Sequence, residues 1–581
     1  MANLSVENET HTADVLILGA GIAGYVVANR VKELNPELSV LLVEKSTAAW
    51  SGSKANKGAG VMWVMEERDD VGKFREYYSA HHGHGLEDQE LLEKVCGTTL
   101  EMVSHLERWG VTIAREADGS LARSSLLPLW ALCAFDLDIL MKMKKVATKY
   151  GVKSVDKTQV VDLLTNGNRV VGAVGFDITN GTFRTFKAKS VVNATGSCCW
   201  MVANMWTSAR GDGIAAAWRA GARMRNGEFS NFYNLGLRGN QAAMVGSQYA
   251  LYNADNEWIA KKYCPDFETD VDIGIILGME KEVRDGKGPI SFEETELFYK
   301  NPLAVGDFLF RWNRPNAKRF WQRLWEGEGK YTSDHAWRPE VIPLFIGECS
   351  PVMTDHEMRT SLEGMWALGD VNRSGAGWAG AVPPPSRIRG SGLTWAAVSA
   401  LLGSKSLAEY AAAASEPEVD EDQVARLREA LYAPMAREKG LDVRESIFHL
   451  QEVISPPRYS ARKSEGRIRE SLARVDEVLH ECDEVAPSGD WHVLGLCHDL
   501  RNMAQCAEIY LTSALERTES RGWHYREDFP RRDDAAWRKW VELVRKDGRP
   551  AVSTRPIPFE TYKTPAVADP WFYESMYEAV K

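Results

Sequence analysis

The sequence has no long apolar run, a deficit of positive charge and a polar, acidic N-terminus. Its 70 lysines and arginines face 81 aspartates and glutamates, and the formal net charge is −11. This balance argues against nucleic acid as the main partner. No apolar run approaches the roughly 18 residues that a membrane span needs, and the first residues lack the pattern of a secretory or mitochondrial leader. We expect a cytoplasmic protein with no membrane span.

Paired-cysteine motifs are also missing. The nine cysteines are an odd number, and none is spaced as CxxC or with histidine as in zinc or iron–sulfur sites. We predict reduced thiols and no metal, so that any iron–sulfur carrier must be another chain. The vicinal pair Cys198 and Cys199 is interpreted as small-residue packing.

The stretch from Val15 to Glu44 reads as strand, glycine turn, helix, strand and acid. Gly19, Gly21 and Gly24 form a GxGxxG turn, and Glu44 follows the last glycine by twenty residues. The first glycine allows the tight turn, the second lets the backbone approach a pyrophosphate, and the third lets the helix pack on the strand. The acid is placed to accept hydrogen bonds from a ribose. These residues predict a dinucleotide site.

The whole chain, of 581 residues, is long enough for two to four domains. Amphipathic patterns predict mainly helix over 69–150, antiparallel strands over 158–193, and a helical bundle over 421–520. The predicted fold class is α/β, with a Rossmann-type domain, an inserted α+β domain and a C-terminal helical domain. The predicted boundaries are 1–225 with 346–412 for the dinucleotide-binding domain, 226–345 for the insertion, 413–525 for the bundle and 526–581 for a C-terminal extension.

Blocks in the same order occur in a known family. They are the glycine turn, Ala194-Thr195-Gly196, Gly211-Asp212-Gly213, Gly364–Asp370, Arg387–Leu393 and Glu519–Asp534. With them the chain resembles the fumarate reductase / succinate dehydrogenase / adenylylsulfate reductase flavoprotein superfamily. The resemblance implies a Rossmann-type FAD-binding domain, a capping domain over the flavin and a C-terminal helical domain. The cofactor-binding residues it implies, together with the small-residue loop after Glu44, are Gly19, Gly21, Ala23, Gly24, Glu44, Lys45, Ser51, Gly52, Ser53, Asn56, Gly58, Ala59, Gly60, Ala194, Thr195, Gly196, Asp212, Gly369, Asp370, Ser391, Gly392 and Leu393.

Departures from the family pattern bear on the chemistry. Ser53 stands where many members carry the histidine that attaches FAD covalently, so we expect noncovalent FAD. Val245 replaces the catalytic arginine of fumarate reductases, Ile346–Pro351 replaces a His-Tyr-x-Met-Gly-Gly segment, and Tyr233 replaces a histidine. Arg387 matches the family arginine that binds substrate carboxylate. These departures look more like the adenylylsulfate reductase α-subunit branch than a fumarate reductase.

The expected activity is an oxidoreductase that transfers hydride between flavin N5 and a small or medium organic anion. Arg387 is the expected anchor for the anion. The other candidates at the catalytic site are Tyr233, Arg238, Tyr249 and Trp378. His524, with Arg526 and Asp528, is interpreted as a structural node or a partner surface and not as chemistry.

Two alternatives stay open. An adenylylsulfate-reductase-like α subunit would pass electrons to a separate iron–sulfur partner, and a non-catalytic relay flavoprotein would have no substrate pocket. The sequence is compatible with a homo-oligomer in each case.

Overall fold

The structure is a computed structural model that describes residues 6–50, 60–127, 130–203, 209–238, 251–265, 273–292, 340–372, 390–565 and 577–581. Within these residues, no helix is both long and apolar enough to cross a membrane.

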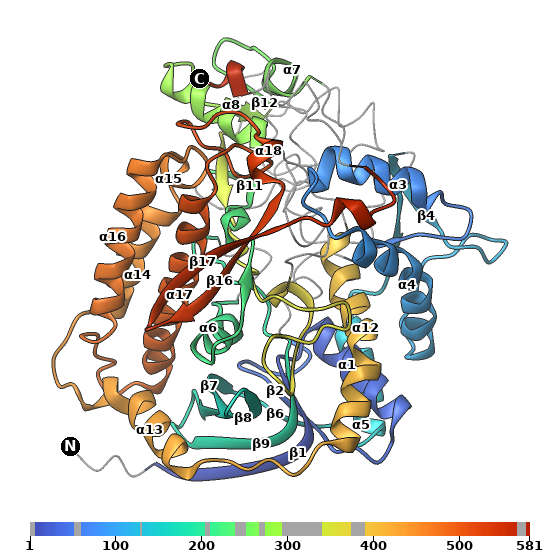
Figure 1. Cartoon of the computed structure of the whole chain (residues 1–581), viewed down its shortest axis with the longest axis vertical. Helices are drawn as coiled ribbons and strands as arrows, with labels where there is room; N and C mark the ends of the chain where they lie inside the picture. Colours follow the sequence, from blue (N-terminus) through green and yellow to red (C-terminus); the bar gives the residue numbers. More distant parts are fainter. Residues whose placement is uncertain are drawn as a thin grey trace, which may run out of the picture.

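A seven-stranded sheet carries the glycine turn near its centre (Figure 1). Its strand order is β6-β2-β1-β9-β8-β7, with β15 paired to the second half of β9. The strands are β1 (Asn8–Leu18), β2 (Val40–Val43), β6 (Lys153–Val155), β7 (Thr158–Asn166), β8 (Arg169–Asp177), β9 (Phe183–Asn193) and β15 (Met365–Ala367). The four strands β6, β2, β1 and β9 are parallel, whereas β7 and β8 form the predicted antiparallel meander.

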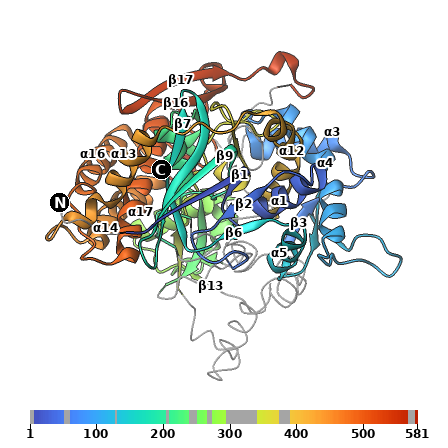
Figure 2. The same ribbon diagram turned by 90° about the horizontal axis from the view of Figure 1, so that it is seen from below.

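Both faces of the central strand are buried. Val15 and Ile17 of β1 belong to one hydrophobic core, and Leu16 and Leu18 belong to the other, as the two-residue period of a strand requires. The first core is covered by α1 (Ile22–Leu34), α4 (Gln89–Arg108), α5 (Ile139–Lys149) and α12 (Ser391–Ala413). The second core lies toward α6 (Asp212–Arg219) and the helical domain, on the opposite side of the sheet (Figure 2).

The region predicted as mainly helical between residues 69 and 150 also contains strands. The predicted helices are found as α3 (Val71–Tyr78), followed by the π-helical turn η1 (Ser79–Gly83), and as α4 and α5. A separate antiparallel sheet joins β3 (Val61–Val64), β5 (Trp130–Ala134) and β4 (Arg123–Leu127). The sequence prediction missed this sheet because its strands are short and lie between long helical patterns.

The described parts of the 226–345 insertion contain both helices and strands. They are η2 (Gly227–Phe229), β11 (Tyr233–Leu237), β12 (Leu251–Tyr252), α7 (Ile259–Tyr263), α8 (Ile273–Arg284), β13 (Ser291–Phe292) and β14 (Val341–Phe345). β11 pairs with β14, and β12 pairs with β13.

The C-terminal region forms a helical bundle and a hairpin. The helices are α13 (Glu421–Tyr432), η6 (Ala433–Ala436), α14 (Val443–Ile454), α15 (Pro457–Ser460), α16 (Glu465–Glu481) and α17 (Trp491–Glu516). They are followed by α18 (Asp534–Trp537), the strands β16 (Lys539–Lys546) and β17 (Arg549–Pro556), and η7 (Phe559–Thr561). β16 also pairs with β10 (Met224–Arg225), which joins the extension to the start of the insertion.

Candidate functional site

A cavity of about 1250 Å³ opens at the carboxyl ends of the parallel strands. This is the edge of an α/β sheet where ligands generally bind. Residues from the glycine turn, from the ends of β2 and β9 and from the start of α12 all contribute to its wall. The predicted cofactor residues that line it are Gly19, Gly21, Ala23, Glu44, Lys45, Ala194, Thr195, Gly196, Asp212, Gly369, Asp370, Gly392 and Leu393.

The glycine turn has no room for side chains. Gly19 has φ of +104°, and a Cβ there would lie 2.5 Å from the Ala194 carbonyl oxygen. A Cβ on Gly24 would lie 2.0 Å from the Gly19 carbonyl oxygen, because α1 packs closely on β1. Gly21 is the N-cap of α1, with no side-chain cap and no acid in the first turn. The N–H groups at this helix end are therefore left for an anionic ligand such as a pyrophosphate.

Glu44 is held in place by two backbone donors. Its Oε2 accepts from the Ala20 N–H at 2.9 Å, and its Oε1 accepts from the Ser46 N–H at 2.9 Å. Each carboxylate oxygen retains a lone pair, so the group can also accept hydrogen bonds from ribose hydroxyls. The acid, the glycine turn and the cavity together fit the adenosine and pyrophosphate parts of FAD.

The turn after β9 is tied to α6. The Asn193 side chain donates to the Gly213 carbonyl at 2.8 Å and accepts from the Thr195 hydroxyl at 2.9 Å. A Cβ on Gly213 would lie 2.1 Å from the Asn193 Oδ1. The Ala-Thr-Gly and Gly-Asp-Gly segments are thus one structural unit, and both contribute residues to the cavity wall.

The N-terminus of α12 forms the far end of the cavity. Its N-cap is Gly390, with φ of +79°, no side-chain cap and no acid in the first turn. The Trp395 indole donates to the Gly369 carbonyl at 3.1 Å, and the Ser399 hydroxyl accepts from the Gly369 N–H at 2.9 Å. α12 therefore fixes the Gly369–Asp370 turn next to its own uncapped end, where the helix dipole favours negative charge.

Lys45 lies in a partly buried group of charges beside Glu44. Its ammonium group donates to Asp499 at 2.5 Å and to Asp212 at 3.3 Å. Burial opposes the charge on each group, but Lys45 and the Gln159 amide outweigh it at Asp212 and hold the pKa of that carboxyl below its usual value. Burial raises the pKa of Asp499, and the nearby Asp212 charge adds to this. Of the two carboxyl groups, Asp212 and Asp499, the site next to Lys45 thus favours one in the charged form.

Some predicted cofactor residues do not line the described cavity or cannot be placed. Gly24 and Ser391 are described but do not line it, and Gly60 accepts a backbone hydrogen bond from Phe135 at 2.9 Å. Ser51, Gly52, Ser53, Asn56, Gly58 and Ala59 lie outside the described residues.

The cavity also has a wall that the sequence did not predict. One part of this wall is formed by residues in and next to the meander, which are Lys157, Thr158, Ile178 and Thr179. The other part is formed by the helical domain, through Ser488, Gly489, Asp490, Trp491, His492, Leu496 and Asp499. Nothing in the sequence marks these positions, because long-range docking of the domains brings them to the cavity.

Two of the five catalytic candidates are described, and neither lines the cavity. Tyr233 is buried, and its hydroxyl donates to the Ser455 carbonyl at 3.0 Å in the helical domain. Burial raises the pKa of Tyr233 well above its usual value. Arg238 is exposed and pairs with Glu340 at 2.5 Å. Arg387, Tyr249 and Trp378 lie outside the described residues.

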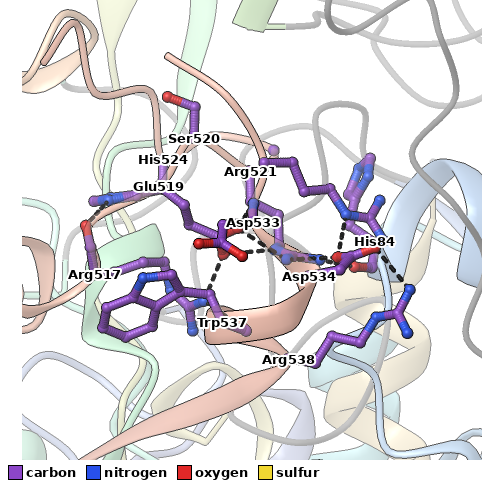
Figure 3. Close-up of polar contacts among 12 residues, drawn as sticks. His84, Arg517, Glu519, Ser520, Arg521, His524, Asp533, Asp534, Trp537 and Arg538 are labelled. Carbon is purple, nitrogen blue, oxygen red and sulfur yellow. Dashed lines mark hydrogen bonds and ion pairs between the residues drawn. The ribbon is translucent and has the colours of Figure 1, made fainter. Parts of the chain in front are cut away.

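The closing segment forms a buried ionic network (Figure 3). Glu519 accepts from Arg517 at 2.8 Å and from Arg521 at 2.7 Å, and Arg521 also donates to Asp534 at 2.8 Å. His524 hydrogen-bonds through Nε2 to the Arg517 carbonyl at 3.0 Å, and burial holds the pKa of His524 well below its usual value. These contacts fit the interpretation of His524 as a structural node.

Comparison with known proteins matches two family models. The one described as an FAD binding domain matches residues 14–241, and the one described as the fumarate reductase flavoprotein C-terminus matches residues 459–569. The L-aspartate oxidase of Yersinia pestis is 24% identical over 566 residues, covering 90% of this chain and 96% of that protein. The fumarate reductase flavoprotein subunit of Haemophilus influenzae is 25% identical over 585 residues, covering 94% and 95%.

Solved structures share the fold over almost the whole chain. A quinol–fumarate reductase with menaquinol superposes with a TM-score of 0.80 at 20% identity, covering 96% of this chain and 100% of that one. The adenylylsulfate reductase of Archaeoglobus fulgidus gives 0.74 at 19% identity, covering 95% and 97%. The fold does not separate the branches, so the expected place near adenylylsulfate reductase stays a prediction. The two family models match in order, so the chain carries the FAD-binding domain and the C-terminal domain of the fumarate reductase flavoproteins and is an FAD-dependent oxidoreductase.

Proposed function

We propose that the enzyme transfers a hydride between N5 of noncovalently bound FAD and a small or medium organic anion, as an enoate reductase or a dehydrogenase. The observation that carries this proposal is the uncapped N-terminus of α12 at the cavity, next to the Gly369–Asp370 turn. The flavin supplies a reversible hydride acceptor at N5. The N–H groups and positive dipole end of α12 favour the negative charge that reduced flavin carries, which raises its tendency to accept hydride.

The substrate class follows from Arg387 and from the relatives. An arginine offers a fixed pair of donors for a carboxylate, and Arg387 occupies the position of the family's carboxylate-binding arginine. The relatives are named for fumarate and L-aspartate, which are both four-carbon dicarboxylates. Because Val245 and Ile346–Pro351 depart from the fumarate reductase pattern, an anion other than fumarate is the favoured substrate.

Among the cap-domain candidates for proton transfer, a tyrosine or an arginine, we propose Tyr249. The other tyrosine candidate, Tyr233, donates its hydroxyl proton to the helical domain, and Arg238 pairs with Glu340 on the surface. A general acid must reach the substrate with a free proton, and these two side chains already have structural partners. Tyr249→Phe should therefore slow turnover, with little change in KM.

The test is anaerobic stopped-flow of the purified, photoreduced enzyme. It is mixed separately with a panel of enoate acids, fumarate, adenylylsulfate, and sulfite with AMP as the reverse control. L-aspartate and saturated acids are tested against the oxidised enzyme. We expect rapid reoxidation by an enoate or rapid bleaching by a saturated acid. Reaction with the sulfur compounds alone, with a copurifying iron–sulfur protein, would assign the enzyme to the sulfur branch. If no organic anion reoxidised the reduced enzyme and none bleached the oxidised enzyme, the proposal would be overturned.

Arg387 is tested with the substrate that this screen finds. Arg387→Lys keeps the charge but loses the paired donors, and we expect kcat/KM to fall about 10- to 100-fold, which corresponds to about 1.4 to 2.8 kcal/mol. Arg501→Lys is the matched control, because Arg501 pairs with Asp483 on the surface of the helical domain. An unchanged kcat/KM for the Arg387 variant would exclude this residue as the anchor.

A further inference from the structure

Helix α17 of the helical domain lies against the cavity in which FAD binds. The residues that reach the cavity wall are Ser488, Gly489, Asp490, Trp491, His492, Leu496 and Asp499. Of these, Asp499 contacts Lys45, which directly follows Glu44 at the end of the cavity that fits adenosine. A domain more than 400 residues away in the sequence thus contributes to the wall of a site that is otherwise built by the sheet.

The contacts between α17 and the FAD-binding domain are polar and specific. Asp499 accepts from Lys45 at 2.5 Å and from the Gln159 amide at 2.8 Å. The same Lys45 and Gln159 also donate to Asp212, at 3.3 and 3.0 Å. Asp499 therefore fixes the side chain of the residue that directly follows the ribose-binding acid.

A second layer of contacts continues along the same helix. The Asn502 amide donates to Asp212 at 3.3 Å, and the Met503 carbonyl accepts from the Trp200 indole at 2.9 Å. A Cβ on Gly211 would lie 2.6 Å from the Cys506 sulfur. Trp200, Gly211 and Asp212 thus rest on α17, and their neighbours Met201 and Arg210 line the cavity.

The loop before α17 is also held in one position. Ser488 and Gly489 have φ of +50° and +80°, and Asp490 caps the helix by accepting from the His492 N–H at 2.7 Å. The Trp491 ring fills the space over Gly181, where a Cβ would lie 2.5 Å from it. The cavity wall at this end is therefore rigid and depends on the docked position of the bundle.

We propose that the start of α17 is part of the FAD site, with Asp499 as a positioning residue, and that FAD binding and docking of the helical domain stabilise each other. FAD contacts both domains at the adenosine end, so it binds the docked arrangement more tightly than an undocked one. By linkage, FAD must then favour docking to the same extent. Neither statement requires a substrate, so the test is independent of the proposed hydride transfer.

The first test is hydrogen exchange of the full-length protein with and without FAD. We expect FAD to slow exchange of the amides between residues 488 and 505 at least about tenfold, because local opening of this segment would require loss of the ligand. Exchange in α16, which does not line the cavity, should change less. Equal exchange of residues 488–505 with and without FAD would overturn the proposal.

The second test compares FAD release from three variants well below their unfolding midpoints. Asp499→Leu removes the acceptor for Lys45 and Gln159, and we expect release about tenfold faster, as for a lost buried hydrogen bond to a charged group. Asp499→Asn keeps an oxygen acceptor and should stay within about threefold of the parent. Asp483→Leu, at an exposed ion pair of the same domain, is the matched control. Release from Asp499→Leu at the rate of this control would exclude Asp499 as a positioning residue. If that variant does not fold, the exchange experiment decides.

Discussion

At the scale of single residues, Lys463 is a buried cation without a described ion-pair partner. Its side chain is fully buried, and among the described residues its ammonium group donates to the Ser460 and Trp523 carbonyls, at 3.1 and 3.3 Å. The Asn231 amide donates to the same two carbonyls, at 2.7 and 2.8 Å. Burial holds the pKa of Lys463 well below its usual value, the Arg526 charge adds to this, and Glu228 opposes it.

Replacing Lys463 with methionine should stabilise the protein at neutral pH. The folded protein holds this proton less tightly than the unfolded chain, which binds it up to a pH of about 10.4. The stability of the parent therefore rises with pH, from the lowered folded-state pKa up to that value. We expect Lys463→Met to be about 1 to 3 kcal/mol more stable at pH 7, and the difference to shrink at pH 9.5. Urea unfolding at the two pH values measures this.

The exposed Lys439 provides the control, since Lys439→Met should change the free energy of unfolding by less than about 0.5 kcal/mol at either pH. A Lys463 variant that is less stable than the parent at pH 7 would contradict the argument. It would mean that the two carbonyl hydrogen bonds outweigh the cost of burying the cation.

The direction of a single side chain was not predictable from the sequence. Tyr233 was expected at the catalytic site from its place in a motif. In the structure, β11 pairs with β14 so that Tyr233 lies opposite Phe345 and its ring packs 5.3 Å from that of Phe345, with the hydroxyl toward the helical domain. Strand register decides the face on which a side chain lies, and a motif does not reveal the register of a distant partner strand.

At the scale of secondary-structure elements, the glycine turn and its flanking strands were predictable because local pattern alone determines them. Strand β9 changes its partner strand along its length, which local pattern does not reveal. Residues Phe183–Lys187 pair with β8, whereas Val191–Asn193 pair with β15. Helix α12 continues to Ala413, because leucine, alanine and glutamate favour helix in its last two turns, over 407–413.

Glu508 links α17 to the C-terminal hairpin. Burial raises its pKa to about 7, although Arg545 and Arg549 of the hairpin lower it, and Asp476 of α16 adds to the rise. The folded protein thus binds a proton between about pH 4.3 and 7 that the unfolded chain has already released. The contribution of Glu508 to stability therefore falls as the pH rises through this range.

Glu508→Gln should remove this pH dependence. We expect the variant to match the parent near pH 4.5 and to be about 1 to 2 kcal/mol more stable at pH 8, a range that allows for the partial exposure of the side chain. Thermal unfolding across this pH range measures the difference, with the exposed Glu452→Gln as the control. A constant difference at all pH values would show that packing, and not the proton, is responsible.

At the scale of the whole molecule, the proposed noncovalent binding of FAD has a measurable consequence. The sequence predicts Ser53 at the position where many superfamily members attach FAD through histidine. FAD that is not attached stabilises the folded state by mass action, by about 2.7 kcal/mol when free FAD is 100 times its Kd. Acid precipitation should therefore release the yellow colour into the supernatant, and added FAD should raise the Tm of the protein.

The shape of the thermal transition then reports on how the domains are joined. The cavity is lined by the sheet, by α12 and by α17, so one ligand contacts elements that span most of the chain. We expect a single transition that moves as a whole with FAD concentration, since loss of the helical domain would open the adenosine end of the site. Two transitions, of which FAD shifts only the one that belongs to the sheet, would show that the helical domain unfolds independently. If added FAD left the Tm unchanged and the colour stayed in the precipitate, FAD would instead be covalently attached, through a residue other than the histidine that many superfamily members use.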